Sequence, residues 1–204
     1  MIVYHYTKLK KWKDIQAGSW QSKNKPGLGA LRKLGTDYNK ASEKSGVFAL
    51  TEPIPDSWIN NTQFPNVWNR LKNNIGKLLL EISIDPKKAM VYDWAEKEKN
   101  DEDNSTEFAE KQYINSGMSL EDYLVNKNLF VLPEVVIEED VPIENIKISD
   151  EQPLLEEKLE ICKGTELEIL KKEIQSIPEL TEWYKNYEAR KEREIGERIG
   201  PKKI

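Results

Sequence analysis

The chain has almost none of the residues that build cross-links and metal cages. Its 204 residues include one cysteine and one histidine. One cysteine excludes a disulfide within the chain, and one cysteine with one histidine excludes a Cys/His zinc cage. We therefore expect no structural metal. Cys162 lies in a charged segment, and we interpret it as a half-buried helix residue rather than a nucleophile.

Long hydrophobic runs are also missing. Runs such as Leu78–Leu80 and Leu129–Leu132 are far shorter than the roughly 20 apolar residues that cross a bilayer. The segment Met1–His5 does not join a basic region to a long apolar stretch, so we expect no signal peptide. These absences predict a cytoplasmic protein that does not bind membranes.

Several common catalytic motifs are absent as well. The chain has no P-loop, and Gly27-Leu28-Gly29 lacks the third glycine of a dinucleotide-binding turn. It has no G-x-S-x-G elbow, and a Ser-His-Asp triad would have to use His5. Any metal site would need carboxylates alone. The run Asp101–Asp103 is the candidate for one, although a solvated charge run explains it better.

Charge is distributed unevenly along the chain. Residues 1–50 hold ten Lys and Arg against three Asp and Glu, whereas residues 111–160 hold four against twelve. The net charge of −5 argues against a general nucleic-acid coat protein. The basic first quarter suits one anionic ligand, such as a pyrophosphate, or a short nucleic-acid strand. The alternative interpretation is a solvated basic surface.

Strand patterns precede residue 150 and helical patterns follow it, which predicts an α+β fold. We expect one domain over residues 1–150 and a helical extension over 151–204 that packs on it. The charged end, 188–204, is expected to fray after a short helix that contains Tyr187. The predicted strands are Ile2–Tyr6, Gly46–Leu50, Lys77–Ile84, Met90–Trp94, Phe130–Glu138 and Ile143–Ile148. Predicted helices within the first domain are 8–17, 67–75, 106–115 and 120–126, with a further helix start at Asp56 or Ser57.

Three segments of the first domain carry more specific expectations. Pro133 has no amide hydrogen, so we expect its strand to lie at a sheet edge or to contain a bulge. Residues 19–45 are glycine-rich in part and are interpreted as a long loop. Residues 95–111 are charged and polar and are interpreted as an exposed insertion or loop.

Two ionisable residues lie within apolar strands. His5 is flanked by Tyr4 and Tyr6, and a lone strand histidine is usually structural. Glu134 lies among the valines and leucine of 131–137, where burying a carboxylate is costly unless it has a partner or a task. The alternative for Glu134 is a side chain that points to water from an edge strand.

Taken in order, three segments resemble the ADP-ribosyltransferase superfamily, in its His-Tyr-Glu branch. They are a histidine strand with its following helix (Tyr4–Gly18), an aromatic strand (Ser45–Thr51) and a glutamate strand (Leu132–Ile137). The strand at 77–84 is similar to the family's central strand. The resemblance covers about residues 1–150 and implies a mixed sheet core of that type.

The resemblance also implies roles in NAD binding. His5 would hydrogen-bond a ribose hydroxyl of NAD, with Tyr6 and Thr7 beside it in the same cofactor-binding strand. Phe48 stands where the family usually has tyrosine. Either Phe48 or Trp58 would stack on the cationic nicotinamide ring.

The same resemblance implies that Glu134 is the catalytic residue. Its carboxylate would bind the 2′-hydroxyl of the nicotinamide ribose and stabilise the positive charge that develops as nicotinamide leaves. Glu138 and Glu139 are rival candidates, of which Glu138 shares the strand face of Glu134. Arg32, with its planar guanidinium, is the candidate for the pyrophosphate.

The sequence departs from the family at three points. Tyr6 follows the histidine where many members have glycine, and Phe48 lacks the tyrosine hydroxyl. No E-x-E ends at Glu134, which disfavours the branch that modifies arginine.

The leading hypothesis is a toxin-like, NAD-dependent mono-ADP-ribosyltransferase whose acceptor is a protein, a nucleic acid or a small molecule. The alternative is a non-catalytic module that binds a nucleotide or partner on the same fold. An RNA 2′-phosphotransferase-like enzyme ranks below both, because it relies on more Arg and His than the chain contains.

Overall fold

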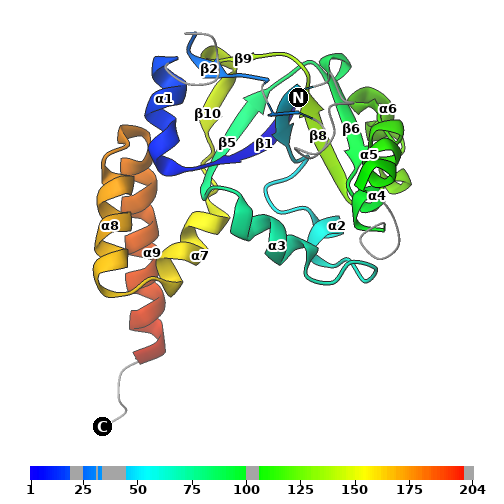
Figure 1. The fold of residues 1–204 in the computed structure, drawn as a ribbon. Helices are drawn as coiled ribbons and strands as arrows, with labels where there is room; N and C mark the ends of the chain where they lie inside the picture. The colour runs from blue at the N-terminus through cyan, green and yellow to red at the C-terminus, as the bar shows by residue number, and fades with distance from the viewer. Residues whose placement is uncertain (19–24, 31, 34–44, 100–105, 200–204) are drawn as a thin grey trace. The chain divides into compact units, whose positions relative to one another are not determined.

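The computed structural model describes residues 1–18, 25–30, 32–33, 45–99 and 106–199 (Figure 1). It divides into two compact units, Met1–Leu154 and Leu155–Ile204. The first unit combines antiparallel sheets with helices, and the described part of the second is helical. The chain therefore has the α+β class that its sequence predicts.

A three-stranded antiparallel sheet contains the first strand of the chain. Its central strand is β5 (Leu78–Ser83), which pairs with β1 (Ile2–Thr7) on one side and β10 (Ile146–Ile148) on the other. The run of aliphatic residues in β5 explains its central place, because the side chains of Leu78, Leu79, Leu80 and Ile82 are fully buried. In this register His5 lies opposite Leu80.

A five-stranded antiparallel sheet carries Arg32, Phe48 and Glu134. Its order is β3-β4-β8-β6-β7. Phe48 lies opposite Val136, and Glu134 lies opposite Tyr92. The strands are β3 (Arg32–Lys33), β4 (Ser45–Ala49), β8 (Pro133–Ile137), β6 (Ala89–Asp93) and β7 (Met118–Ser119).

The expectation that Pro133 marks an edge or a bulge is wrong. Strand β8 is central, with β4 on one side and β6 on the other. Pro133 is its first residue, where the missing amide hydrogen interrupts no ladder further along the strand. The residues after it, Glu134 to Ile137, are all buried.

The two sheets meet where β1 passes the end of β4. Tyr4 and Leu50 form an antiparallel bridge, in which the backbone N–H of each donates to the carbonyl oxygen of the other over 2.8 Å. This bridge aligns the histidine strand with the aromatic strand.

Helices of the first unit begin and end largely as the sequence predicts. The first helical segment ends at Gly18, which adopts φ = 68° at the C-cap. Ser119 caps α6 by accepting a hydrogen bond from the backbone N–H of Asp122. Figure 1 shows α4, α5 and α6 beside β6 and β8. The helices are α1 (Trp12–Ala17), α2 (Asp56–Ile59), α3 (Val67–Asn74), α4 (Ala95–Glu98), α5 (Thr106–Asn115) and α6 (Leu120–Val125), with 3-10 turns η1 (Leu9–Lys11), η2 (Pro86–Lys88), η3 (Lys127–Leu129) and η4 (Ile143–Asn145).

Two segments interpreted as loops contain regular structure. Within residues 19–45, β3 joins the larger sheet, and β2 (Gly27–Leu28) pairs with β9 (Val141–Pro142). Strands of two residues are too short to leave a periodic pattern. Within 95–111, α4 begins at Ala95, which is fully buried and is held by the buried carboxylate of Asp93.

The described part of the second unit is helical, with α7 (Pro153–Ile161) beginning just before it, followed by α8 (Gly164–Gln175), η5 (Pro178–Leu180) and α9 (Thr181–Ile199). Cys162 follows α7 directly and is buried, more deeply than expected. None of the helices in the described ranges has both the length and the apolar composition needed to cross a bilayer.

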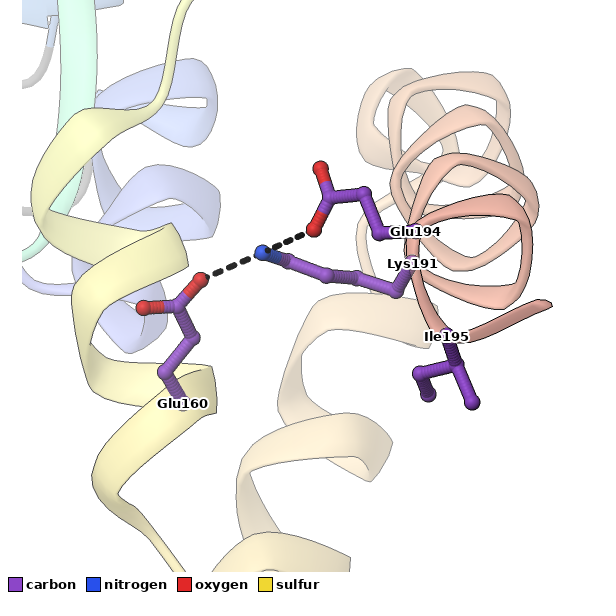
Figure 2. Close-up of a pocket in the computed structure, with 4 residues that line it drawn as sticks. All are labelled: Glu160, Lys191, Glu194 and Ile195. Atoms are coloured by element: carbon purple, nitrogen blue, oxygen red, sulfur yellow. Dashed lines mark hydrogen bonds and ion pairs between the residues drawn. The ribbon is translucent and has the colours of Figure 1, made fainter. Parts of the chain in front are cut away.

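The short final helix expected around Tyr187 continues in the structure to Ile199. Glu, Lys, Arg and Ala dominate residues 188–194, and these residues favour helix. Lys191 also forms ion pairs, at 2.6 Å to Glu160 of α7 and 3.0 Å to Glu194 of α9 (Figure 2). Residues 200–204 lie outside the described ranges.

Candidate functional site

A small pocket in the first unit brings together residues from three strands. His5 from β1, Phe48 from β4 and Glu134 from β8 all line it. Its volume is about 70 Å³. The β1–β4 junction and helix α3 supply the remaining lining residues, which are Tyr4, Tyr6, Ala49, Leu50, Leu71 and Ile75. The three residues that define the sequence resemblance therefore share one pocket.

His5 is held by the strand that it faces. Its Nδ1 lies 2.7 Å from the carbonyl oxygen of Phe48. A carbonyl oxygen can only accept, so Nδ1 carries the hydrogen and donates it. In the neutral ring Nε2 is then the acceptor nitrogen. This is the protonation pattern that suits a hydroxyl donor such as a ribose.

Glu134 is buried in the middle of the larger sheet, with 6% of its surface exposed. The interpretation of an edge side chain pointing to water is therefore wrong. The hydroxyl of Tyr113 donates to Glu134 Oε2 over 2.6 Å. This hydrogen bond offsets part of the free-energy cost of burying the Glu134 carboxylate.

The rival carboxylates lie elsewhere. Glu138 is exposed, and its Oε1 accepts a hydrogen bond of 3.2 Å from the hydroxyl of Tyr92. Glu139 is exposed and forms an ion pair of 3.3 Å with Lys88. Among the three glutamates, Glu134 is the one that lines the pocket.

Tyr113 is a site residue that the sequence reasoning missed. It lies on α5, is fully buried, and its ring centroid is 5.2 Å from that of Tyr92 and 6.0 Å from that of Trp94. The Nζ of Lys97 lies 4.1 Å from the Tyr113 ring centroid. No local sequence pattern links Tyr113 to Glu134, because they belong to different elements 21 residues apart.

Trp58 has a structural role in this structure. Its exposed fraction is 1%, and its Nε1 donates to the carbonyl oxygen of Pro133 over 3.0 Å. A ring buried this deeply offers no face to a ligand, which leaves Phe48 as the candidate for the expected stacking. The hydrogen bond from Trp58 instead holds Pro133, the residue that precedes Glu134.

Of the other expected binding residues, Tyr6 is the one that the structure places in the lining of the pocket. Its hydroxyl donates to the carbonyl oxygen of Pro53 over 2.8 Å. Burial raises the pKa of Tyr6 well above its ordinary value. Thr7 ends β1 opposite Leu78. Arg32 lies in β3 opposite Gly46, and its side chain lies outside the described part of the structure.

The pocket differs from a whole dinucleotide site in size. Ligand pockets typically span roughly 300–1,000 Å³, whereas this one has about 70 Å³. Leu71 of α3, the C-cap residue Ile75 and Phe48 of β4 contribute apolar residues to its lining. The pocket therefore suits one ring and an adjoining polar group rather than a complete dinucleotide.

A second pocket lies in the helical unit and is lined by Glu160, Lys191, Glu194 and Ile195 (Figure 2). Its lysine is shared between the two carboxylates, and all three charged groups are partly exposed. We therefore attribute this pocket to the packing of α7 and α9.

No group of three or more His, Cys, Asp and Glu side chains could hold a metal ion within the described ranges. The run Asp101–Asp103, which was the candidate for an all-carboxylate site, lies outside those ranges.

Comparisons with protein-family models, curated proteins and solved structures find no match for this chain. The likeness to ADP-ribosyltransferases therefore stays a prediction from the sequence segments.

Proposed function

We propose that the first unit is an NAD-dependent mono-ADP-ribosyltransferase, which cleaves the nicotinamide–ribose bond of NAD and transfers ADP-ribose to an acceptor. The observation that carries this proposal is the pocket shared by His5, Phe48 and Glu134. The combination of an imidazole, an aromatic ring and a buried carboxylate from distant parts of the chain in one pocket is typical of a binding or catalytic site.

The strand arrangement supports an ADP-ribosyltransferase type of fold. The histidine and glutamate strands belong to two different antiparallel sheets, and the aromatic strand β4 touches both of them. The pocket lies where these sheets meet. The domain that carries the activity is then the first unit, Met1–Leu154.

In this proposal His5 and Phe48 hold the nicotinamide riboside end of NAD. Nε2 of His5 accepts a hydrogen bond from a ribose hydroxyl, while Nδ1 keeps the ring in place through its bond to Phe48. The face of Phe48 lies against the cationic nicotinamide ring, a contact worth about 0.5–2 kcal/mol. The rest of the dinucleotide extends beyond the pocket, which has about 70 Å³.

Glu134 supplies the chemistry. The bond between the ribose carbon and nicotinamide breaks, and its electron pair leaves with the nicotinamide ring. The Glu134 carboxylate hydrogen-bonds the ribose 2′-hydroxyl and stabilises the positive charge at the ribose carbon. The acceptor nucleophile then forms a bond to that carbon and loses its proton. A preorganised charge in a buried site contributes about 3–4 kcal/mol to such a step.

The experiment is nicotinamide release from NAD by the purified chain, with cell lysate present as a source of acceptor. Glu134→Gln keeps the shape and an acceptor oxygen but removes the charge, so release should fall about 100-fold or more. Glu138→Gln is the matched control because its carboxylate is exposed outside the pocket. If wild type releases no nicotinamide, or if both variants behave alike, the proposed chemistry is wrong.

NAD binding is tested separately through the histidine. The chain has one histidine, so a single set of imidazole NMR signals reports on the pocket. The proposal requires these signals to shift when NAD is added. A shift without any nicotinamide release would favour the non-catalytic binding module.

A further inference from the structure

We infer that Tyr113 is a positioning residue that orients the Glu134 carboxylate for the proposed reaction, and this inference rests on the proposed function. The hydroxyl of Tyr113 donates to Glu134 Oε2 over 2.6 Å. Both residues are buried, at 0% and 6% exposure. A bond between a phenol and a carboxylate in a dry environment fixes the rotation of the carboxylate about its last torsion.

Three neighbouring side chains hold the ring of Tyr113 in place, and with it the hydroxyl. Its ring lies at 33° to the ring of Tyr92 and at 77° to the ring of Trp94. Lys97 lies over both the Tyr113 ring and the Trp94 ring, at 4.1 and 4.3 Å from their centroids. The hydroxyl therefore reaches Glu134 from a ring whose own orientation is set by three neighbours.

Helix placement supports the same role. Ser116 follows α5 and links the end of this helix to β6. Its hydroxyl donates to the carbonyl oxygen of Tyr113 over 2.6 Å and accepts from the backbone N–H of Asp93 over 2.9 Å. Tyr113 is thus fixed relative to the strand that pairs with Glu134.

A purely structural role predicts different behaviour from a positioning role. If Tyr113 only fills space, removing its hydroxyl changes stability but leaves the turnover of the folded enzyme intact. If it orients Glu134, removing the hydroxyl lowers kcat while the KM for NAD stays nearly constant, because the lost interaction acts in the transition state.

The test compares Tyr113→Phe with Tyr92→Phe, which loses a hydroxyl that donates to the exposed Glu138. We expect kcat for nicotinamide release to fall about tenfold or more in Tyr113→Phe, with KM within about twofold. Tyr92→Phe should keep kcat within about twofold. In the Glu134→Gln background, Tyr113→Phe should cause little further loss, because the two residues act together. An unchanged kcat in Tyr113→Phe overturns the inference.

A second readout does not depend on activity. The ¹³C resonance of the Glu134 side-chain carboxyl, identified by its loss in Glu134→Gln, should shift in Tyr113→Phe and stay in place in Tyr92→Phe without NAD present. If wild type releases no nicotinamide, the proposed function fails, and the shifted resonance still supports the orientation of Glu134 by Tyr113. An unshifted resonance overturns it.

Unnatural residues that keep the volume of the Tyr113 ring distinguish the loss of the hydrogen bond from a folding defect. Incorporating p-aminophenylalanine at position 113 keeps a donor at the position of the hydroxyl, whereas p-fluorophenylalanine fills the space without donating. We expect the first to restore the resonance and kcat towards wild type and the second to behave as Tyr113→Phe. Equal behaviour of the two overturns the inference.

Discussion

The imidazole of His5 donates through Nδ1 to the backbone carbonyl of Phe48, 2.7 Å away, and so links two strands of different sheets. The bond lies beside the bridge between Tyr4 and Leu50. It therefore serves two purposes that mutation can separate. One is to hold β1 against β4, and the other is to fix the direction in which the second ring nitrogen points.

Two amide substitutions of His5 separate these purposes. His5→Asn places an amide donor near the position of Nδ1 and removes Nε2, so the Phe48 bond persists while the proposed ribose contact is lost. We expect thermal stability close to that of wild type and NAD binding weakened about three- to tenfold, as measured by calorimetric titration. His5→Gln reaches the position of Nε2 but leaves the Phe48 carbonyl without its donor, so it should bind NAD better than His5→Asn and unfold at a lower temperature. The reverse order for NAD binding would contradict the assignment of Nε2.

Asp93 is expected to be one of the most sensitive positions for stability. Its buried carboxylate accepts hydrogen bonds from the backbone N–H groups of Ala95, Val131 and Leu132. Asp93→Ala leaves these donors without their acceptor, and we expect a loss of about 3–5 kcal/mol in the free energy of unfolding by urea. Asp85→Ala is the control, because Asp85 is exposed and accepts from the backbone N–H of Lys87 alone in its 3-10 turn. It should cost about 1 kcal/mol. Similar losses in the two variants would show that Asp93 contributes no more than an ordinary cap.

Tyr6 makes the first unit sensitive to alkaline pH. Burial raises the pKa of Tyr6 in the folded chain, whereas in the unfolded chain the phenol titrates near about 10. Above that pH the unfolded state loses a proton that the folded state keeps, so stability present below pH about 10 is lost as pH rises. The slope from this residue is up to about 1.4 kcal/mol per pH unit.

The measurement is urea unfolding at pH 8, 10 and 11, followed by tryptophan fluorescence. Tyr6→Phe should be less stable at pH 8 by about 1 kcal/mol, because its bond to Pro53 is lost. It should also lose less stability between pH 10 and 11 than wild type. An equal alkaline loss in both proteins would assign the effect to other tyrosines, such as Tyr123, whose pKa burial also raises.

The last part of α9 is expected to contribute little to stability. Deleting residues 190–204 removes the ion pairs from Arg190 to Glu156 and from Lys191 to Glu160, and all four side chains are partly exposed. Water and salt screen such pairs. Thermal scans by circular dichroism should show a slightly lower midpoint, with the difference smaller in 1 M salt. Loss of cooperative unfolding in the helical unit would show that the end of α9 is part of its folding core.

Much of the fold follows from local patterns. The aliphatic run that forms β5, the alternating residues of β1 and the apolar segment of β4 predict strands where the structure has them. Gly18 and Ser119 mark helix ends through their own backbone and side-chain chemistry. The order of the three motif segments also led to the residues that now share a pocket, although their functional roles stay predictions.

What the sequence did not reveal depends on pairing between distant segments. Pro133 indicates an edge only if it lies inside a strand, and tertiary pairing made it the first residue of a central one. An aromatic residue such as Trp58 looks the same in a sequence whether it faces a ligand or the core. Tyr113 reaches Glu134 only because α5 packs beside β6, and no residue spacing encodes that approach.

His5 and Glu134 belong to different sheets. The width of the pocket between them therefore depends on how the two sheets are joined. Each sheet has its own ladder of hydrogen bonds, whereas β1 and the segment of β4 are joined by the bridge between Tyr4 and Leu50 and by the bond from His5 to Phe48. A larger or smaller side chain at this junction would change the distance between the His5 imidazole and the Glu134 carboxylate. The hydrogen bonds within each sheet would stay intact. Such changes would widen or narrow the pocket without replacing His5, Phe48 or Glu134.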